Sequence, residues 1–340
     1  MRNERVAMLR RIATIVAIAI FIVAASPRGA RAELPAPLDA LAHDVRSLAA
    51  RISSPTALEV FDLSTGFRAG FNATQSMPAA STIKIPVMVE VFRQLQAGKF
   101  DLERHVTLLA RDKDYGSGEL CDAPVGTTYS ITDLLEKMID ISDNTATNML
   151  IRLVGRRNIN VSMRELGLTR TRLSQDIRTG SWSVRSALRT SPHDLVRLLE
   201  MMARRQLIDE WSSNQMIAIL EEDQINTLLP EPLPDDVEIA HKTGSFFDTL
   251  NDAGIVYADN APYVIAVMTT ALPSQNLGRS FIHLLSRRVY SDELTFARWR
   301  SQTGFATAYG LHATPTGMTP DLRYWSTGST LDVGSGGGGD

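Results

Sequence analysis

Strand-like segments lie near both ends of this chain, and a long stretch of helical pattern separates them. Short apolar and β-branched runs predict strands at 57–63, 67–72, 237–245, 253–258 and 263–270. Apolar residues at helical spacing predict helices at 38–52, 81–97, 131–140, 144–154, 157–166, 192–206, 209–222 and 275–297. We therefore expect the strands from both ends to form one antiparallel sheet, with the first and last helices packed on it.

This order of elements indicates an α/β fold of the α+β type with two lobes inside one domain at 33–300. The sheet lobe is expected from about 38–75 and 230–300, and an all-helical lobe from about 76–229. A cleft between two lobes is a common place for a substrate. The irregular loop 168–190 also points to function, because loops longer than roughly 15 residues in compact domains are usually functional or disordered.

The first 32 residues have the parts of an export signal. Basic residues precede an apolar run at 12–25, and Ala30-Arg31-Ala32 is a small-x-small cleavage site. Since the run is shorter than the roughly 20 residues that span a bilayer, we expect cleavage and a periplasmic or secreted product; an uncleaved anchor is the alternative. Residues 301–340 are rich in Gly, Thr and Ser, which predicts a low-complexity, disordered tail.

Composition excludes several classes of function. Removing residues 1–32 takes away six arginines and one glutamate, so the net charge changes from −3 to −8 and leaves no basic surplus for nucleic acid. The single cysteine, Cys121, excludes an internal disulfide and a cysteine-built zinc site. The histidines lack metal-ligand spacing, so we expect no metal or other cofactor. The expected partner is a small-molecule substrate, bound by a monomer without a stable membrane span.

Three short motifs stand out in a chain that has only five lysines among 35 basic residues. They are Ser81-Thr82-Ile83-Lys84, Ser142-Asp143-Asn144 and Lys242-Thr243-Gly244. By composition, all three in this order are expected by chance at well below ~10⁻² per chain. The alternative is that the motifs are helix caps and a strand end, and Asp143 is expected to cap a helix in any case.

The first and third motifs contain the parts of an activated nucleophile. Ser81 precedes an apolar-periodic segment, so its hydroxyl is expected near a helix N-terminus, where developing negative charge is favoured. Lys84 follows three residues later on the same face and can act as the base, because a lysine that is desolvated or crowded by another cation loses its proton. Lys242 is expected to be that second cation and to bind a substrate carboxylate.

The other motif residues are expected to line the cleft. Ser142 can relay a proton to the leaving nitrogen, and Asn144 can offer its amide to a substrate carbonyl. The backbone N–H groups of Ser81 and Ser245 can form an oxyanion hole if the strand 237–245 runs along the cleft. That strand also brings substrate-binding groups to the site, from Thr243, Gly244 and Ser245.

The motifs, their order and the strand–helix–strand layout over about 38–297 resemble the penicillin-recognising serine enzymes, class A β-lactamases in particular. The gaps of 61 residues from Ser81 to Ser142 and of 100 residues from Ser142 to Lys242 are similar to that family. The resemblance implies a β-lactamase/transpeptidase-like fold and an exported serine hydrolase that acts on β-lactams through an acyl-enzyme on Ser81. It also implies that Lys84 is the acylation base and that Lys242 to Ser245 bind the β-lactam.

The long loop departs from the pattern of class A enzymes, which carry a glutamate there to activate the water that hydrolyses the acyl-enzyme. The loop 168–190 contains no glutamate, although the family's helix start follows it as Thr190-Ser191-Pro192. Spacing places Gln175 at the expected position, and glutamine cannot take a proton. Asp176 can serve only if the loop shifts by one residue. The alternatives to an efficient β-lactamase are therefore a penicillin-binding D-alanyl peptidase with slow deacylation and a catalytically weak binding homologue.

Overall fold

The computed structural model describes residues 35–304 with the exception of Trp182, so the expected export signal lies outside the described residues. The described residues from Pro37 to Gly304 belong to one compact unit. Within the described ranges, no helix is both long and apolar enough to cross a bilayer. The last helix continues to Thr303, so residues 301–303, which we expected in the tail, are helical, and the rest of the expected tail from 305 is not described.

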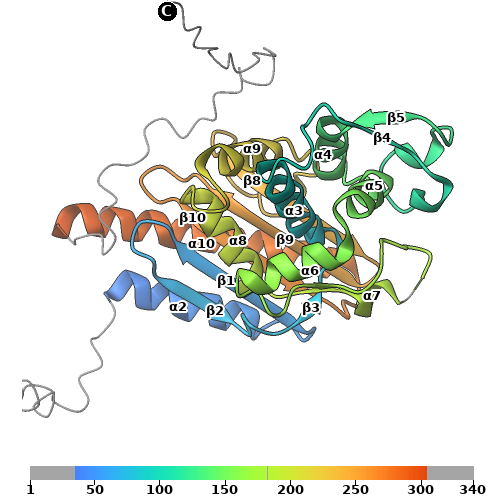
Figure 1. Cartoon of the computed structure of the whole chain (residues 1–340). Helices are drawn as coiled ribbons and strands as arrows, with labels where there is room; N and C mark the ends of the chain where they lie inside the picture. The colour runs from blue at the N-terminus through green and yellow to red at the C-terminus, as the bar shows by residue number, and fades with distance from the viewer. Residues whose placement is uncertain (1–34, 182, 305–340) are drawn as a thin grey trace, which may run out of the picture. The chain divides into compact units, whose positions relative to one another are not determined.

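Strands from both ends of the chain form one antiparallel sheet in the order β2-β1-β10-β9-β8, as predicted (Figure 1). The strands are β1 (Thr56–Asp62), β2 (Arg68–Phe71), β8 (Ile239–Phe246), β9 (Thr249–Val256) and β10 (Tyr263–Thr269). In the centre β1 pairs with β10, with Thr56 opposite Thr269 and Asp62 opposite Tyr263. This pairing places β8, which carries the third motif, at an edge of the sheet.

Both faces of the sheet are covered, because each central strand is apolar on both sides. Leu58 and Val60 of β1 face α2 (Ala36–Ala49) and α10 (Gln275–Thr303), which supply Leu41, Val45 and Ile282 among others to one hydrophobic cluster. Neighbouring β1 side chains point the opposite way, into a larger cluster shared with the helical region. The terminal helices thus cover one face of the sheet, as expected.

The helices of the central region pack on the other face. They are α3 (Lys84–Gln96), α4 (Ile131–Asp140), α5 (Asn144–Val154), α6 (Arg156–Glu165), α8 (Pro192–Ala203) and α9 (Glu210–Glu221). Their starts follow local capping chemistry: Ser130 caps α4, Asp143 caps α5 and Ser191 caps α8, each accepting a backbone N–H from three residues on. The prediction that Asp143 caps a helix is confirmed.

Several short elements were not predicted from the sequence. The loop 168–190, expected to be irregular, contains β6 (Arg172–Leu173), α7 (Val184–Ala187) and β7 (Leu188–Thr190). β7 pairs with β3 (Met77–Pro78), the segment that leads into the first motif, so the end of the loop is tied to the approach to Ser81. A two-stranded antiparallel sheet of β4 (His105–Thr107) and β5 (Thr128–Ser130) also lies within the helical region.

Candidate active site

Ser81 lies on a short 3₁₀ turn, η1 (Ala80–Ile83), that runs directly into α3. The serine is therefore one turn ahead of the α-helix proper, slightly earlier than the predicted helix start. Hydrogen bonds from the side chains of Asn251 and Thr82 hold this turn in place. Asn251 of β9 donates to the carbonyl oxygens of Pro78 and Ala79 at 2.9 and 3.0 Å, and the hydroxyl of Thr82 donates to the Ala79 oxygen at 2.7 Å.

Lys84, the first residue of α3, is fully buried behind the serine. Its Nζ donates to Ser81 Oγ at 3.2 Å, to Ser142 Oγ at 2.8 Å and to Asn144 Oδ1 at 2.9 Å. Burial lowers the pKa of the Lys84 ammonium well below its ordinary value, and the charge of Lys242 lowers that pKa further. Ser81 Oγ thus lies beside a lysine that can exist as a neutral amine.

The second motif forms the turn between α4 and α5. Ser142 has a φ of 56°, in the left-handed region, and this conformation brings both its carbonyl oxygen and its hydroxyl within hydrogen-bond distance of Lys84 Nζ. Asp143 Oδ2 accepts the backbone N–H groups of Glu119 and Leu120, which packs the preceding loop against the turn. Gly118 is required there, because a Cβ at this position would lie 2.2 Å from Asp143 Oδ2.

Strand β8 runs directly beside η1, the turn that carries Ser81. The expected oxyanion hole needs this arrangement. A Cβ built on Gly244 would lie 3.1 Å from the Ala79 oxygen, from the Ser81 nitrogen and from the Thr82 nitrogen. Glycine at 244 therefore lets the backbone of β8 approach the backbone of Ser81. Thr243 and Ser245, on either side of it, both line the adjoining pocket.

For the acyl-enzyme chemistry that the resemblance implies, replacing Gly244 with valine is expected to lower the rate of Ser81 acylation about a hundredfold, because a displacement of the serine by even 1 Å can cost that much. The side chain would push apart two backbones that are already in contact. Acylation kinetics with a chromogenic β-lactam would measure the effect, and denaturant unfolding would show whether the fold is retained. A folded variant acylated at the wild-type rate would contradict the close approach.

One pocket of about 800 Å³ brings the motifs together. Residues of all three motif segments line it: Ser81, Ser142, Asn144, Thr243 and Ser245. Lys84 and Lys242 are fully buried in the wall behind these residues. The predicted residues thus converge on one pocket, with hydroxyl and amide groups at its surface and both ammonium groups beneath it.

A model of the beta-lactamase enzyme family matches residues 40–292. This chain belongs to the beta-lactamase enzyme family. Beta-lactamase CARB-3 of Pseudomonas aeruginosa is 22% identical over 233 residues, covering 66% of this chain and 80% of CARB-3. The structure of PBP-A is similar with a TM-score of 0.70 and 30% identity, covering 74% of this chain and 95% of PBP-A. A PBP-A variant solved as an acyl-enzyme complex with penicillin G also has a TM-score of 0.70, at 31% identity, covering 75% and 96%.

Within this beta-lactamase family framework, Lys242 has a partner that the sequence did not indicate. Its Nζ donates to Asp223 Oδ2 at 2.9 Å, and both side chains are completely buried. The expected effect of Lys242 on the pKa of Lys84 agrees with the structure. That Lys242 binds a substrate carboxylate stays a prediction: its ammonium contacts Asp223, and Lys242 is not among the residues that line the pocket. Asp223 belongs to none of the three motifs, so only the fold reveals this pair.

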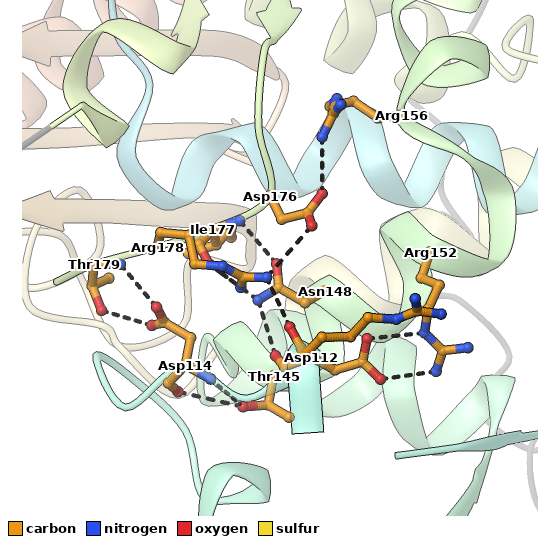
Figure 2. Close-up of polar contacts among 11 residues, drawn as sticks. Asp112, Asp114, Thr145, Asn148, Arg152, Arg156, Asp176, Ile177, Arg178 and Thr179 are labelled. Carbon is orange, nitrogen blue, oxygen red and sulfur yellow. Dashed lines mark hydrogen bonds and ion pairs between the residues drawn. The ribbon is translucent and has the colours of Figure 1, made fainter. Parts of the chain in front are cut away.

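Gln175 and Asp176, the two residues of loop 168–190 considered as deacylation bases, do not line the pocket. Asp176 pairs with Arg156 at 3.2 Å and with Arg178 at 3.5 Å, and Figure 2 shows its carboxylate directed at these arginines. Gln175 accepts a hydrogen bond from Ser183 Oγ at 3.2 Å. Neither residue lines the pocket, so the one-residue shift that would bring Asp176 to the site does not occur. The carboxylate that does line the described pocket is Asp114, which sequence reasoning missed because it lies in no motif.

Proposed function

We propose that β-lactams acylate Ser81 and that the resulting acyl-enzyme breaks down slowly, so that the protein acts as a penicillin-binding serine enzyme of the D-alanyl peptidase type. The contact between Nζ of the buried Lys84 and Ser81 Oγ, at 3.2 Å, carries the first part of this proposal. Gln175 and Asp176 both lie outside the pocket lining, and this supports the second part, the slow breakdown of the acyl-enzyme. Membership of the beta-lactamase family supports the first part.

The positions of three side chains support the proposed acylation step. Neutral Lys84 takes the proton of Ser81 Oγ as the oxygen attacks the lactam carbonyl carbon. The C–N bond of the lactam then breaks, and Ser142 passes a proton to the departing nitrogen while it receives one from Lys84, which lies 2.8 Å from its hydroxyl. Backbone N–H groups of Ser81 and Ser245 would stabilise the oxyanion. The nitrogen stays tethered to the opened ring, so the whole β-lactam remains on the serine.

Hydrolysis of this ester needs a base that activates water, and the described pocket wall provides a weak one. Burial alone would raise the pKa of Asp114, but hydrogen bonds from Thr179, Asn144 and Gly116 outweigh burial and hold that pKa below its ordinary value. A carboxylate with a lowered pKa accepts a proton reluctantly. The second candidate is an efficient β-lactam hydrolase, which the likeness to CARB-3 favours.

Intact-mass measurements after a short exposure to benzylpenicillin distinguish these candidates. We expect stoichiometric modification of the wild-type protein, a slow return to the unmodified mass once free penicillin is removed, and little turnover of a chromogenic cephalosporin. Rapid loss of the adduct with fast cephalosporin turnover would favour the hydrolase. Absence of any adduct with penicillins, cephalosporins and ester probes would overturn the proposal in favour of a non-catalytic binding protein.

The pH dependence of the acylation rate should show whether Lys84 is the base that accepts the Ser81 proton. Protonated Lys84 cannot accept the Ser81 proton, so the acylation rate should fall as pH falls through the pKa of this lysine. Because burial and Lys242 lower that pKa, the rate should reach its plateau well below the ordinary lysine pKa of about 10.4. Acylation rates measured at a series of pH values under single-turnover conditions would show this fall in rate at low pH. A rate that rises only near the ordinary lysine pKa would contradict the proposed base.

We also propose that the protein acts outside the cytoplasm after cleavage behind Ala32, because residues 1–32 combine a basic segment, an apolar run and a small-x-small site. Expression of the full chain in a bacterial host, followed by fractionation and N-terminal sequencing, tests this proposal. A periplasmic or secreted product that starts at Glu33 would support it. A product that keeps residue 1 in the membrane fraction would favour the anchored alternative.

A further inference from the structure

The segment 156–189, from the start of α6 to β7, carries an excess of positive charge that the proposed chemistry does not use. It contains eight arginines and no lysine, against two acidic residues, in a chain whose expected mature form has a net charge of −8. Four of these arginines are exposed, and none of the four forms an ion pair with a described residue. We call these four residues the arginine patch: Arg157, Arg164, Arg170 and Arg172.

Two members of the arginine patch lie on the outward side of α6. Arg157 and Arg164 are seven residues apart, which is about two helical turns, so their side chains share one side of the helix. Ile159 lies on the buried side of the same helix. Glu165 follows Arg164 in sequence but pairs with Arg93 of α3 at 2.8 Å. This acid therefore does not neutralise the outward side of α6.

The other two members lie in the segment that leads into β6. Exposure alternates there, because Thr171 and Leu173 are 4% and 1% exposed whereas Arg170 and Arg172 are exposed. The amide of Asn160 on α6 fixes this segment beside the helix, since it binds the Leu173 nitrogen at 2.8 Å and the Leu173 oxygen at 2.7 Å. Asn160 lies between the two arginines of α6, so all four guanidinium groups come from one region of the surface.

The acidic side chains of this region are engaged elsewhere. Asp176 contacts Arg156 and Arg178, as Figure 2 shows, and neither of these arginines belongs to the arginine patch. Asp194 is 2% exposed, and its carboxylate accepts the backbone N–H of Arg170 at 2.9 Å. Its contact is therefore with the backbone of the patch, and the guanidinium groups keep their full charge toward solvent.

Across the small sheet, Arg189 adds a further positive charge. β6 and β7 pair so that Arg172 lies directly opposite Arg189. The Arg189 guanidinium donates to the carbonyl oxygen and to the hydroxyl of Ser76, which are neutral groups. Like charges at directly opposite positions of two strands destabilise the pair. An anion bound at the surface would reduce this repulsion.

The chemistry of the arginine patch favours an extended surface of phosphate groups. Arginine binds phosphate through two parallel N–H groups, and a surface region of one sign attracts polyanions. No member of the patch lines the described pocket, so a small anion finds no cavity there. None of the large exposed apolar side chains of the described residues belongs to segment 156–189, so the contact is electrostatic and does not insert into the hydrocarbon layer.

We propose that the arginine patch docks this protein on the phosphate headgroups of an anionic lipid bilayer. The inference is independent of Ser81 acylation. The proposed location outside the cytoplasm, together with the negative net charge, favours lipid over nucleic acid as the partner. Each basic residue close to an anionic membrane strengthens binding roughly fivefold, so the four together contribute on the order of 10²- to 10³-fold. Salt should weaken the binding, because it screens exposed charges.

Sedimentation with lipid vesicles tests the proposal. One set of vesicles is phosphatidylcholine alone, and the other contains equal parts of phosphatidylcholine and phosphatidylglycerol. The wild-type protein is compared with a patch variant, in which the four patch arginines become glutamine, and with a control variant that loses the same charge. The control substitutions are at four exposed arginines in or near α2 and α10, on the other face of the sheet: Arg46→Gln, Arg51→Gln, Arg287→Gln and Arg298→Gln.

We expect the wild-type protein and the control variant to bind the anionic vesicles and not the neutral ones. The patch variant should bind the anionic vesicles on the order of 10²-fold more weakly. All three proteins share the same N-terminal residues, so the differences between them report on the substituted arginines. Acylation by benzylpenicillin should proceed at the same rate in all three, since no patch residue lines the pocket. A wild-type protein that binds vesicles but is not acylated would reject only the proposed function.

Failure of the wild-type protein to bind anionic vesicles would overturn the inference, and so would equal losses in the patch and control variants. Binding to duplex DNA or to a soluble glycerol-phosphate polymer without binding to vesicles would also overturn it. Denaturant unfolding shows whether each variant is folded. If the patch variant does not fold, the double variants Arg157→Gln/Arg164→Gln and Arg170→Gln/Arg172→Gln should each bind roughly twentyfold more weakly; unchanged binding by both would contradict the proposal.

Discussion

Replacing Lys84 with arginine is expected to lower the rate of Ser81 acylation on the order of 10³-fold, the typical contribution of a general base. Arginine keeps the positive charge but does not release its proton in proteins. The fully buried position, within 3.2 Å of Ser81 Oγ, leaves Lys84 as the residue able to take the serine proton. Single-turnover acylation by a chromogenic cephalosporin would measure the loss.

Lys99→Arg is the matched control for this variant, because Lys99 is exposed just beyond the end of α3. Its acylation rate should equal that of the wild-type protein. The Lys84→Arg protein also needs an unfolding measurement, since a larger side chain must fit a buried site. A folded Lys84→Arg protein that is acylated at nearly the wild-type rate would show that another group activates Ser81.

Replacing Asp223 with asparagine is expected to reduce the free energy of unfolding by about 3–5 kcal/mol, the usual cost of leaving a buried charge without its partner. Lys242 is completely buried, and Asp223 Oδ2 accepts from its Nζ at 2.9 Å and from the Thr243 nitrogen at 3.3 Å. The cost is large against the roughly 5–15 kcal/mol that stabilises a typical domain. Denaturant unfolding at neutral pH would measure it.

A double variant separates the loss of the ion pair from general damage to the site. When Lys242→Met accompanies Asp223→Leu, no buried charge remains, so stability should recover to a large part even though the site loses its second cation. If the single Asp223→Asn substitution lowers the free energy of unfolding by less than about 1 kcal/mol, the Lys242–Asp223 pair contributes no more than a solvent-exposed ion pair. That outcome would contradict the burial of Lys242.

The sequence predicted the five strands of the sheet because each contains part of an apolar or β-branched run. The limits of α4 and α5 were also predicted, because Ser130 and Asp143 cap them. The beginning of β9 was missed: the prediction started at 253, whereas the strand starts at Thr249. Asn251 and Asp252 interrupt the apolar pattern there, yet both are buried and satisfied, the first by the carbonyls before Ser81 and the second by His241 and the Leu229 nitrogen.

The motif residues could be found in the sequence because their types and spacing are rare. The residues that bind them could not be found in this way. Asp223 and Asp114 come from connections far from Lys242 and Asn144 in sequence, and nothing local distinguishes them from other aspartates. The direction of Asp176 was also beyond sequence reasoning, because Arg156, which binds it, lies on α6 outside the loop. Tertiary contacts decide which carboxylate reaches the pocket, and these contacts exist only in the folded chain.

Mapping the adduct formed with benzylpenicillin tests the central claim, that Ser81 is the acylated nucleophile, most directly. We expect the intact mass to increase by one whole penicillin molecule, because ring opening releases no leaving group, and peptide mapping to place this mass on the peptide that contains Ser81. The Ser81→Ala protein should stay unmodified. An adduct on another residue, or a Ser81→Ala protein modified at the wild-type rate, would contradict the claim.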